Sequence, residues 1–168
     1  QCVVLGMGKY GARELNYSSD IDIVVFYEPD GIVSLDSHKL AEFWIDLTRD
    51  LSTILQFTTD AGFVFRVDLR LRPDPGSTPV AVSIPAAETY YESFGQNWER
   101  AAFIKARQIA GDKRTGDKLL AILSPFIWRK NLDFAAIEDV HAMKRQIHAV
   151  RGHGQIAVAG HNIKLGRG

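Results

Sequence analysis

The chain has 168 residues, of which 46% are hydrophobic and 24% are charged, a balance typical of a folded globular protein. Its 20 basic and 20 acidic residues give a formal net charge of zero, so no overall field favours nucleic acid or a membrane surface as a partner. Cys2 is the single cysteine, which excludes an internal disulfide, and neither a membrane-spanning apolar run nor a signal peptide is present, so we expect a cytoplasmic protein.

The predicted elements begin with two short buried strands. Val3 to Leu5 runs into a glycine-rich turn at Gly6 to Gly11, and Ile21 to Tyr27 is rich in β-branched and aromatic residues. Asp36 to Leu55 places apolar residues at three- and four-residue spacing, which predicts one amphipathic helix. Phe63 to Leu71 alternates apolar with polar residues and predicts the clearest strand of the chain.

Beyond Pro73 to Gly76, which ends that strand, the pattern changes to helix. Pro79 to Ile84 predicts one more short strand, and Asp112 and Asp133 are expected to cap helices. The helices predicted after it are Pro85 to Phe94, Asn97 to Ile109, Gly116 to Trp128 and Phe134 to Arg151. We predict an α+β fold with a core at residues 1–95 and a helical segment at residues 96–168, whose tail from Gly152 is a loop or an unpaired strand. Because the chain begins without Met inside an apolar run, we expect a piece of a longer protein.

Asp20 and Asp22 open the second predicted strand, where alternation puts both carboxylates on one face. An isolated Asp-x-Asp is often a solvated strand edge, but the apolar residues that follow indicate a buried strand, in which paired carboxylates are costly unless a cation neutralises them. Asp68, on the polar face of the alternating strand, completes a set of three if the two strands are neighbours. Such a set suits Mg²⁺ or Mn²⁺, and two metal ions about 3.5–4 Å apart can assist both oxygens of a nucleotidyl transfer.

The glycine-rich turn has two interpretations. At Gly8 and Lys9 its backbone N–H groups can approach a phosphate closely. The spacing of the glycines in Gly6 to Gly11 is also the dinucleotide-binding pattern, with Glu28 at the end of the next strand as the ribose-binding acid, which would indicate NAD. The eight residues Ala12 to Ser19 are too few for the helix of a parallel crossover, and this disfavours NAD.

Three arginines flank Asp68 on the polar face of its strand: Arg66, Arg70 and Arg72. Guanidinium groups can hold a phosphate through two parallel hydrogen bonds, or they can serve as counter-charges for the acidic cluster. The sequence favours neither role over the other.

Five blocks of sequence occur in a recognisable order. They are Gly6 to Asp22 (Gly-Met-Gly-Lys-Tyr-Gly-Ala-Arg-Glu-Leu-Asn-Tyr-Ser-Ser-Asp-Ile-Asp), Val67 to Pro73, Tyr90 to Ser93, Asn97 to Arg100 and Lys105 to Arg107. Together they span nearly the whole chain and resemble the bacterial glutamine synthetase adenylyltransferase family. The resemblance implies a nucleotidyltransferase fold of the DNA polymerase β type, with a mixed sheet and helices followed by a helical segment. The chain departs from the pattern at Lys9, where the wider superfamily usually has Ser, and at Ala12, where the family often has Gly.

The resemblance also implies roles for individual residues. Asp20, Asp22 and Asp68 are the expected catalytic, metal-binding carboxylates. The expected nucleotide- or phosphate-binding residues are Gly8, Lys9, Ser19, Arg70, Arg72 and Lys105. ATP or ADP is then substrate or product, glutamine synthetase is the protein partner, and a PII-type nitrogen-signalling protein acts on the full-length enzyme.

Enzymes of this family carry two such catalytic units, one that adds AMP to a tyrosine of glutamine synthetase and one that removes it. Glu14 to Ser19, Tyr90 to Glu92 and Ile163 to Gly168 resemble the N-terminal, adenylyl-removing half. The resemblance therefore implies phosphorolysis of a tyrosyl-AMP to ADP. The alternatives are ATP-dependent addition of AMP by a C-terminal-type unit, an NAD-binding module, and a docking or regulatory domain without catalysis.

Overall fold

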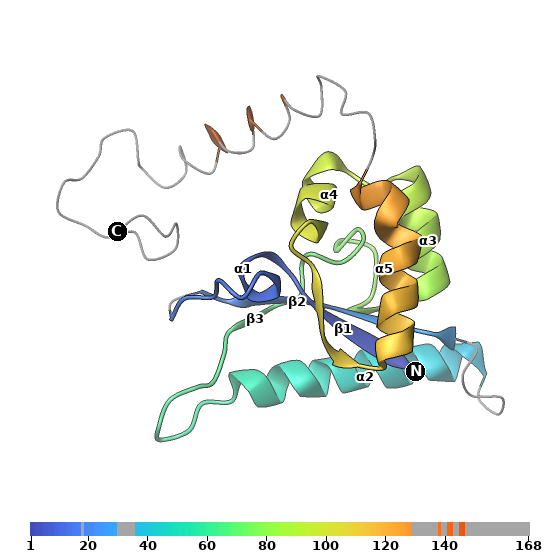
Figure 1. The fold of residues 1–168 in the computed structure, drawn as a ribbon. Helices are drawn as coiled ribbons and strands as arrows, with labels where there is room; N and C mark the ends of the chain where they lie inside the picture. Colours follow the sequence, from blue (N-terminus) through green and yellow to red (C-terminus); the bar gives the residue numbers. More distant parts are fainter. Residues whose placement is uncertain (18, 30–35, 129–137, 139–140, 143–144, 147–168) are drawn as a thin grey trace.

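The apolar run Ile21–Tyr27 forms β2, the central strand of a mixed five-stranded sheet in the computed structural model of the protein (Figure 1). The structure describes residues 1–17, 19–29, 36–128, 138, 141–142 and 145–146. Its elements are β1 (Cys2–Gly6), α1 (Gly8–Gly11), β2, α2 (Ser37–Gln56), β3 (Val67–Asp68), β4 (Ala81–Ser83), α3 (Ile84–Ser93), α4 (Asn97–Phe103), β5 (Arg107–Gly111) and α5 (Lys113–Ile127). The predicted α+β class is confirmed.

The two edges of β2 are occupied differently. On one edge β1 runs antiparallel, with Cys2 opposite Tyr27, and β5 continues the sheet beyond β1. The other edge is shared by two short parallel strands, β3 against Ile21 and the residue after it, and β4 against the last three residues of β2. On this edge the start of β2 therefore has β3 as its only neighbouring strand among the described residues.

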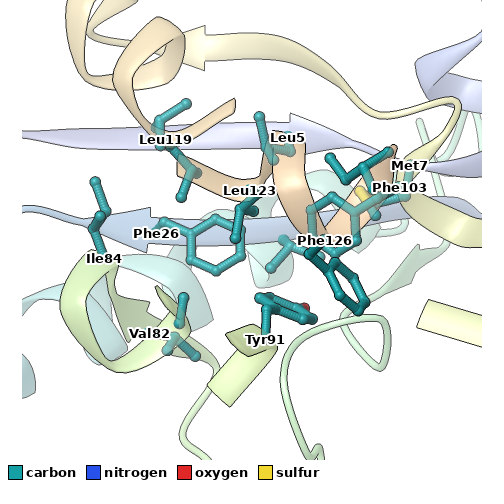
Figure 2. Packing of buried hydrophobic residues seen from close by; sticks show 14 residues of the cluster. Leu5, Met7, Phe26, Val82, Ile84, Tyr91, Phe103, Leu119, Leu123 and Phe126 are labelled. Atoms are coloured by element: carbon teal, nitrogen blue, oxygen red, sulfur yellow. The ribbon is translucent and has the colours of Figure 1, made fainter. Parts of the chain in front are cut away.

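Strand β2 is buried on both faces because its side chains alternate between two apolar clusters. Val24 and Phe26 face the first cluster, which helices α3 and α5 cover and which Figure 2 shows in close view. Ile23 and Val25 face the second cluster together with Trp44 of α2. Figure 1 shows the corresponding layers, with α2 on one side of the sheet and α3, α4 and α5 on the other. Burying each such side chain contributes about 1.5–3 kcal/mol to the free energy of unfolding, so the burial of β2 on both faces contributes strongly to the stability of the fold.

The helix predicted from Asp36 to Leu55 is confirmed as α2, and the cap predicted at Asp112 is confirmed at the start of α5, which begins three residues before the predicted Gly116. In α2 the Asp36 carboxylate accepts a hydrogen bond from the backbone N–H of His38 (3.4 Å), and Leu40 and Trp44 lie on the buried face. In α5 the Asp112 carboxylate accepts a hydrogen bond from the backbone N–H of Thr115 (2.8 Å). Each cap satisfies a backbone donor that the first turn of a helix leaves without a partner. Among the described residues, no helix is long and apolar enough to cross a membrane.

The strand predicted from Phe63 to Leu71 is wrong in length, because only Val67 and Asp68 pair with β2. The chain turns immediately afterwards, since the Asp68 carboxylate accepts a hydrogen bond from the backbone N–H of Arg70 (2.8 Å). A side chain that binds the backbone two residues on competes with the ladder of a strand. Alternation nevertheless extends beyond the ladder, because Phe65 and Leu69 pack against the second cluster, on the α2 side, as Val67 does.

The helix predicted from Asn97 to Ile109 is also wrong in its second half. It ends at Phe103, and Arg107–Gly111 forms strand β5 on the free edge of β1. Local periodicity cannot show that a segment pairs with a strand that is far away in the sequence. The predicted helix Phe134 to Arg151 and the tail after it lie largely outside the described residues. The division after residue 95 stays a prediction, although β5 and α5 both contact β1.

Gly11 offers a test of this packing. A Cβ atom there would overlap the backbone carbonyl oxygens of Lys105 and Gly6, neither of which can rotate away. We expect Gly11→Ala to lower the free energy of unfolding by about 1–3 kcal/mol through overpacking, measured by urea denaturation. Gly76→Ala is the matched control, because the nearest atom to its Cβ is the Asp74 carboxylate at 3.7 Å. Equal effects of the two substitutions would show that the close approach at Gly11 is unimportant.

Candidate active site at the start of the central strand

Asp22 and Asp68 face each other across two neighbouring strands. The parallel register of β2 and β3 pairs Ile21 with Val67 and Asp22 with Asp68. Ile21 and Val67 both pack on the α2 side of the sheet, so alternation turns the two carboxylates to the opposite face. The condition for a set of three carboxylates, that the strand of Asp68 lies beside the strand of Asp22, is met, whereas the ligand role of these residues stays a prediction.

Negative charge accumulates at Asp22. Burial first, and then the charges of Asp68 and Asp20, raise its pKa from 3.8 to about 6, while Arg70 acts in the opposite direction. The pKa of Asp68 is instead lowered, chiefly because Arg70 donates hydrogen bonds to its carboxylate. Carboxylates with such different environments in one cluster are typical of a functional site.

Two of the three predicted arginines are counter-charges in this structure. Arg66 Nε lies 2.5 Å from Asp20 Oδ1. The fork of Arg70 donates to both Asp68 oxygens, with Nη2 at 2.5 Å and Nε at 3.0 Å. Arg72 differs, because it donates to backbone carbonyls of the loop that follows β3, including that of Pro75 at 2.8 Å, and its burial lowers its pKa. The phosphate-binding roles expected for Arg70 and Arg72 stay predictions.

The donor set suits a divalent cation, although the side chains are not gathered around one point. Within the described residues no three His, Cys, Asp or Glu side chains form a metal-ligand group. Asp20 and Asp68 are turned towards their arginines instead. Arg70 is 81% exposed, so it can leave Asp68 without loss of packing. Carboxylate oxygens around a half-buried Asp22 are the ligands that Mg²⁺ and Mn²⁺ prefer, and they fit such an ion.

Gly8 brings the backbone of α1 close to Asp22. Its φ is +51°, in the left-handed region that favours glycine, and a Cβ there would lie 3.4 Å from Asp22 Oδ2. The backbone N–H of Met7 donates to the Asp22 carbonyl (2.8 Å), which joins the turn to the start of β2. Glycine at this position therefore allows the turn to approach the Asp22 carboxylate closely.

The dinucleotide-binding interpretation of the three glycines is wrong. It requires parallel strands joined by a full helix, whereas β1 and β2 are antiparallel and α1 has four residues. Glu28, the expected ribose-binding acid, forms an ion pair with Lys118 of α5 (3.0 Å). The glycines serve close packing and the turn beside Asp22.

The other predicted phosphate-binding residues lie around the segment between α1 and β2. Ser19 Oγ donates to Asn16 Oδ1 (2.7 Å), and Lys105 Nζ lies 2.5 Å from Glu14 Oε2. Lys9 follows Gly8 within α1. The structure thus brings Ser19 and Lys105 to one segment, while their binding of phosphate stays a prediction.

Arg107 is a positioning residue that the sequence did not reveal. Its guanidinium donates to the backbone carbonyls of Gly11 (2.9 Å) and Tyr10 (3.3 Å), where α1 ends. These contacts tie β5 to the turn that carries Gly8. The signal was present in the block from Lys105 to Arg107, but the partner carbonyls lie almost 100 residues away, at separations of 96 and 97.

Glu99 is a second residue that the sequence analysis did not single out. It is buried on α4, where its Oε2 accepts hydrogen bonds from the backbone N–H of Gln96 (2.8 Å) and from Tyr90 Oη (3.1 Å). Burial raises its pKa. The spacing Gln96-x-x-Glu99 is the signal that could have found it, because it forms a capping box at the start of α4.

The fold and the site define a mixed α+β domain with a carboxylate cluster at the start of its central strand, beside a glycine turn. The family model described as glutamate-ammonia ligase adenylyltransferase matches residues 1–122 of the chain. The chain belongs to this family.

Its relatives share most of the sequence. The bifunctional glutamine synthetase adenylyltransferase/adenylyl-removing enzymes of Rhizobium meliloti (strain 1021) and Brucella suis biovar 1 are 64% and 63% identical over 166 residues. The enzyme of that name from Xanthobacter autotrophicus is 59% identical over 165 residues. These matches cover 98–99% of this chain, which spans 17% of the length of the curated relatives. The family expected from the five blocks is confirmed, whereas the assignment to one half stays a prediction.

The charge at Asp22 predicts a stability effect in the absence of metal. Because its pKa is raised to about 6, the folded protein binds more protons than the unfolded chain between pH 4 and pH 6, so this group makes stability fall as pH rises through that window. We expect Asp22→Asn in EDTA at pH 8 to raise the free energy of unfolding by on the order of 1 kcal/mol, discounted for partial exposure. The gain should vanish near pH 4, where Asp22 is protonated.

Thermal unfolding at the two pH values measures this difference. Asp60→Asn is the matched control, because Asp60 is exposed in a turn after α2. A gain of equal size at both pH values, or a loss at pH 8, would contradict the charge accumulation described here.

Proposed function

We propose that this chain carries the catalytic centre for removal of AMP from a tyrosine of glutamine synthetase, in a nucleotidyltransferase fold of the DNA polymerase β type. The observation that carries the proposal is the register of Asp22 opposite Asp68, with Asp20 two residues earlier, in a member of the adenylyltransferase family. The substrate is inferred from the names of the relatives, which are glutamine synthetase adenylyltransferase/adenylyl-removing enzymes.

The proposed reaction is a phosphorolysis. An oxygen of inorganic phosphate attacks the α-phosphorus of tyrosyl-AMP in line, the bond between phosphorus and the tyrosine oxygen breaks, and that oxygen takes up a proton. The products are ADP and free tyrosine, and no covalent enzyme intermediate is needed. Catalysis then depends on positioning and on neutralising charge, as in other phosphoryl transfers.

Each residue of the site has a proposed part. Asp20, Asp22 and Asp68 would hold Mg²⁺ or Mn²⁺, which when bound supplies charge neutralisation at the phosphate and at the leaving oxygen. The Gly8 turn lets the α1 backbone approach the phosphate. Exposed Arg70 leaves Asp68 and neutralises a phosphate oxygen. The remaining phosphate contacts are proposed for Lys9, Ser19, Arg72 and Lys105.

Addition of AMP is the alternative, because the relatives are named for both activities. With ATP and the tyrosine hydroxyl in the same geometry, the hydroxyl oxygen attacks the α-phosphorus, pyrophosphate leaves, and tyrosyl-AMP forms. We favour removal because Glu14 to Ser19 and Tyr90 to Glu92 resemble the N-terminal half of the family. Regulation by a PII-type protein and a cytoplasmic location belong to the same proposal.

Asp20→Asn and Asp68→Asn test the proposal in an enzyme of the relatives' full length that carries this sequence. We expect each substitution to lower phosphate-dependent release of ADP from adenylylated glutamine synthetase by on the order of 10³-fold, because charge neutralisation at the phosphate is lost. Circular dichroism should show an unchanged fold, and Asp60→Asn should keep full activity.

ATP-dependent addition of AMP is measured on the same variants. We expect it to persist, because the addition unit lies elsewhere in a bifunctional enzyme. Loss of addition with intact removal would assign the chain to the adding unit instead. Near-normal rates in both directions would exclude a catalytic role and favour a docking or regulatory domain.

A further inference from the structure

A surface hollow of about 290 Å³ lies next to the carboxylate cluster. Its walls come from the segment just before Asp20 and from residues 63–66, which lead into β3. The two segments are far apart in sequence and meet because β3 pairs with the start of β2. The hollow is therefore built by the same strand pairing that sets Asp22 opposite Asp68.

Much of the wall of the hollow is apolar and exposed, and Asn16, Ser19 and Arg66 add polar groups to it. Tyr17 is fully exposed, Val64 is 68% exposed and Phe63 is 51% exposed. None of these three belongs to either apolar cluster of the described residues, so the fold does not require their bulk. Large apolar side chains that gather on a surface without contributing to the core are typical of a binding site.

The apolar wall continues up to the charged site. Arg66 lines the hollow, its Nε lies 2.5 Å from Asp20 Oδ1, and its guanidinium carbon lies 5.9 Å from the centre of the Phe63 ring. A ligand that fills the hollow and also reaches Asp20 would therefore contact an aromatic ring at one end and the charged cluster at the other. Only the Arg66 side chain separates these two surroundings.

We propose that this hollow receives the aromatic ring of the tyrosine from which AMP is removed, a proposal that rests on the function proposed above. In a tyrosyl phosphodiester the ring is bonded to the phosphate through one oxygen, so an uncharged aromatic group directly adjoins an anion. The hollow has groups in the same order, because Arg66 lies beside the Phe63 ring and also pairs with Asp20 of the carboxylate cluster.

The adenosine part of the substrate does not match this arrangement. A ribose with two hydroxyl groups separates adenine from the phosphate, whereas the guanidinium carbon of Arg66 lies 5.9 Å from the centre of the Phe63 ring, which offers no hydrogen-bond partner to hydroxyl groups. An aromatic ring bonded directly to the phosphate oxygen therefore suits this position better than a ribose does, and the nucleoside would then lie on the other side of the phosphate.

The test compares two esters of AMP, one with a phenyl group and one with a methyl group on the phosphate, by titration calorimetry with Mn²⁺ in the full-length enzyme. We expect the phenyl ester to bind about tenfold more tightly than the methyl ester, because its ring enters an aromatic site. Phe63→Ala should abolish this ratio and leave the affinity for the methyl ester unchanged, while Phe63→Tyr should restore the ratio.

Phe43→Ala is the matched control, because Phe43 is 50% exposed and lies near the start of α2, away from the hollow. It should keep the ratio of the native enzyme. A native enzyme that binds both esters equally would overturn the inference and leave the proposed function standing. Equal weakening of both esters and of AMP by Phe63→Ala would overturn it by placing the nucleoside in the hollow. Failure of every AMP ester to bind would overturn the proposed function as well.

Discussion

The parallel pairing of β2 with β3 is the constraint on which the rest of the site depends. It lasts for only two residue pairs, Ile21 with Val67 and Asp22 with Asp68. Ile21 and Val67 determine which face of the sheet the carboxylates occupy. Both apolar side chains pack towards α2, so the two carboxylates lie on the opposite face. A shift of the register by one residue would bury a carboxylate in the α2 cluster. The apolar packing therefore holds together two groups that repel each other.

Other parts of the fold leave this end of the sheet accessible. Two strands share one edge of β2, so the start of the strand is bordered by short β3 and by the α1 turn. Gly8 keeps the turn narrow, and Arg107 fastens its end to β5. The large cluster around Phe26 lies further along β2 and supplies stability away from the carboxylates. The packed part and the charged part of β2 are thus separated along the strand, so carboxylates that repel one another lie at one end of a well-packed strand.

Local sequence predicted the elements whose patterns are long and uninterrupted. Strand β2 and helix α2 were expected at nearly their observed bounds, because each is packed along most of its length. The glycine turn was also predictable. The proximity of Asp68 to Asp22 was only a condition of the predicted metal site, because alternation along Phe63 to Leu71 gives the face of Asp68 and not the neighbour of its strand. What local sequence could not supply were interactions between distant segments, since periodicity carries no information about partners.

Two examples show what the sequence lacked. The strand around Asp68 was predicted to be nine residues from Phe63 to Leu71 and is two, because its own carboxylate binds the backbone N–H of Arg70. Two of the arginines near Asp68 are counter-charges, because Arg66 pairs with Asp20 and Arg70 pairs with Asp68. Which arginines form such ion pairs depends on the register of the two strands. The residues of the family's motifs were visible in the sequence, but their mutual geometry was not.

Mn²⁺ binding measured by electron paramagnetic resonance tests the central claim most directly, namely that this carboxylate cluster holds a divalent cation. In the full-length enzyme with ADP present, we expect a saturable class of Mn²⁺ sites that Asp22→Asn removes and that Asp60→Asn leaves intact. An unchanged number and affinity of Mn²⁺ sites in Asp22→Asn would contradict the claim, and the register of β2 and β3 would then have only a structural meaning.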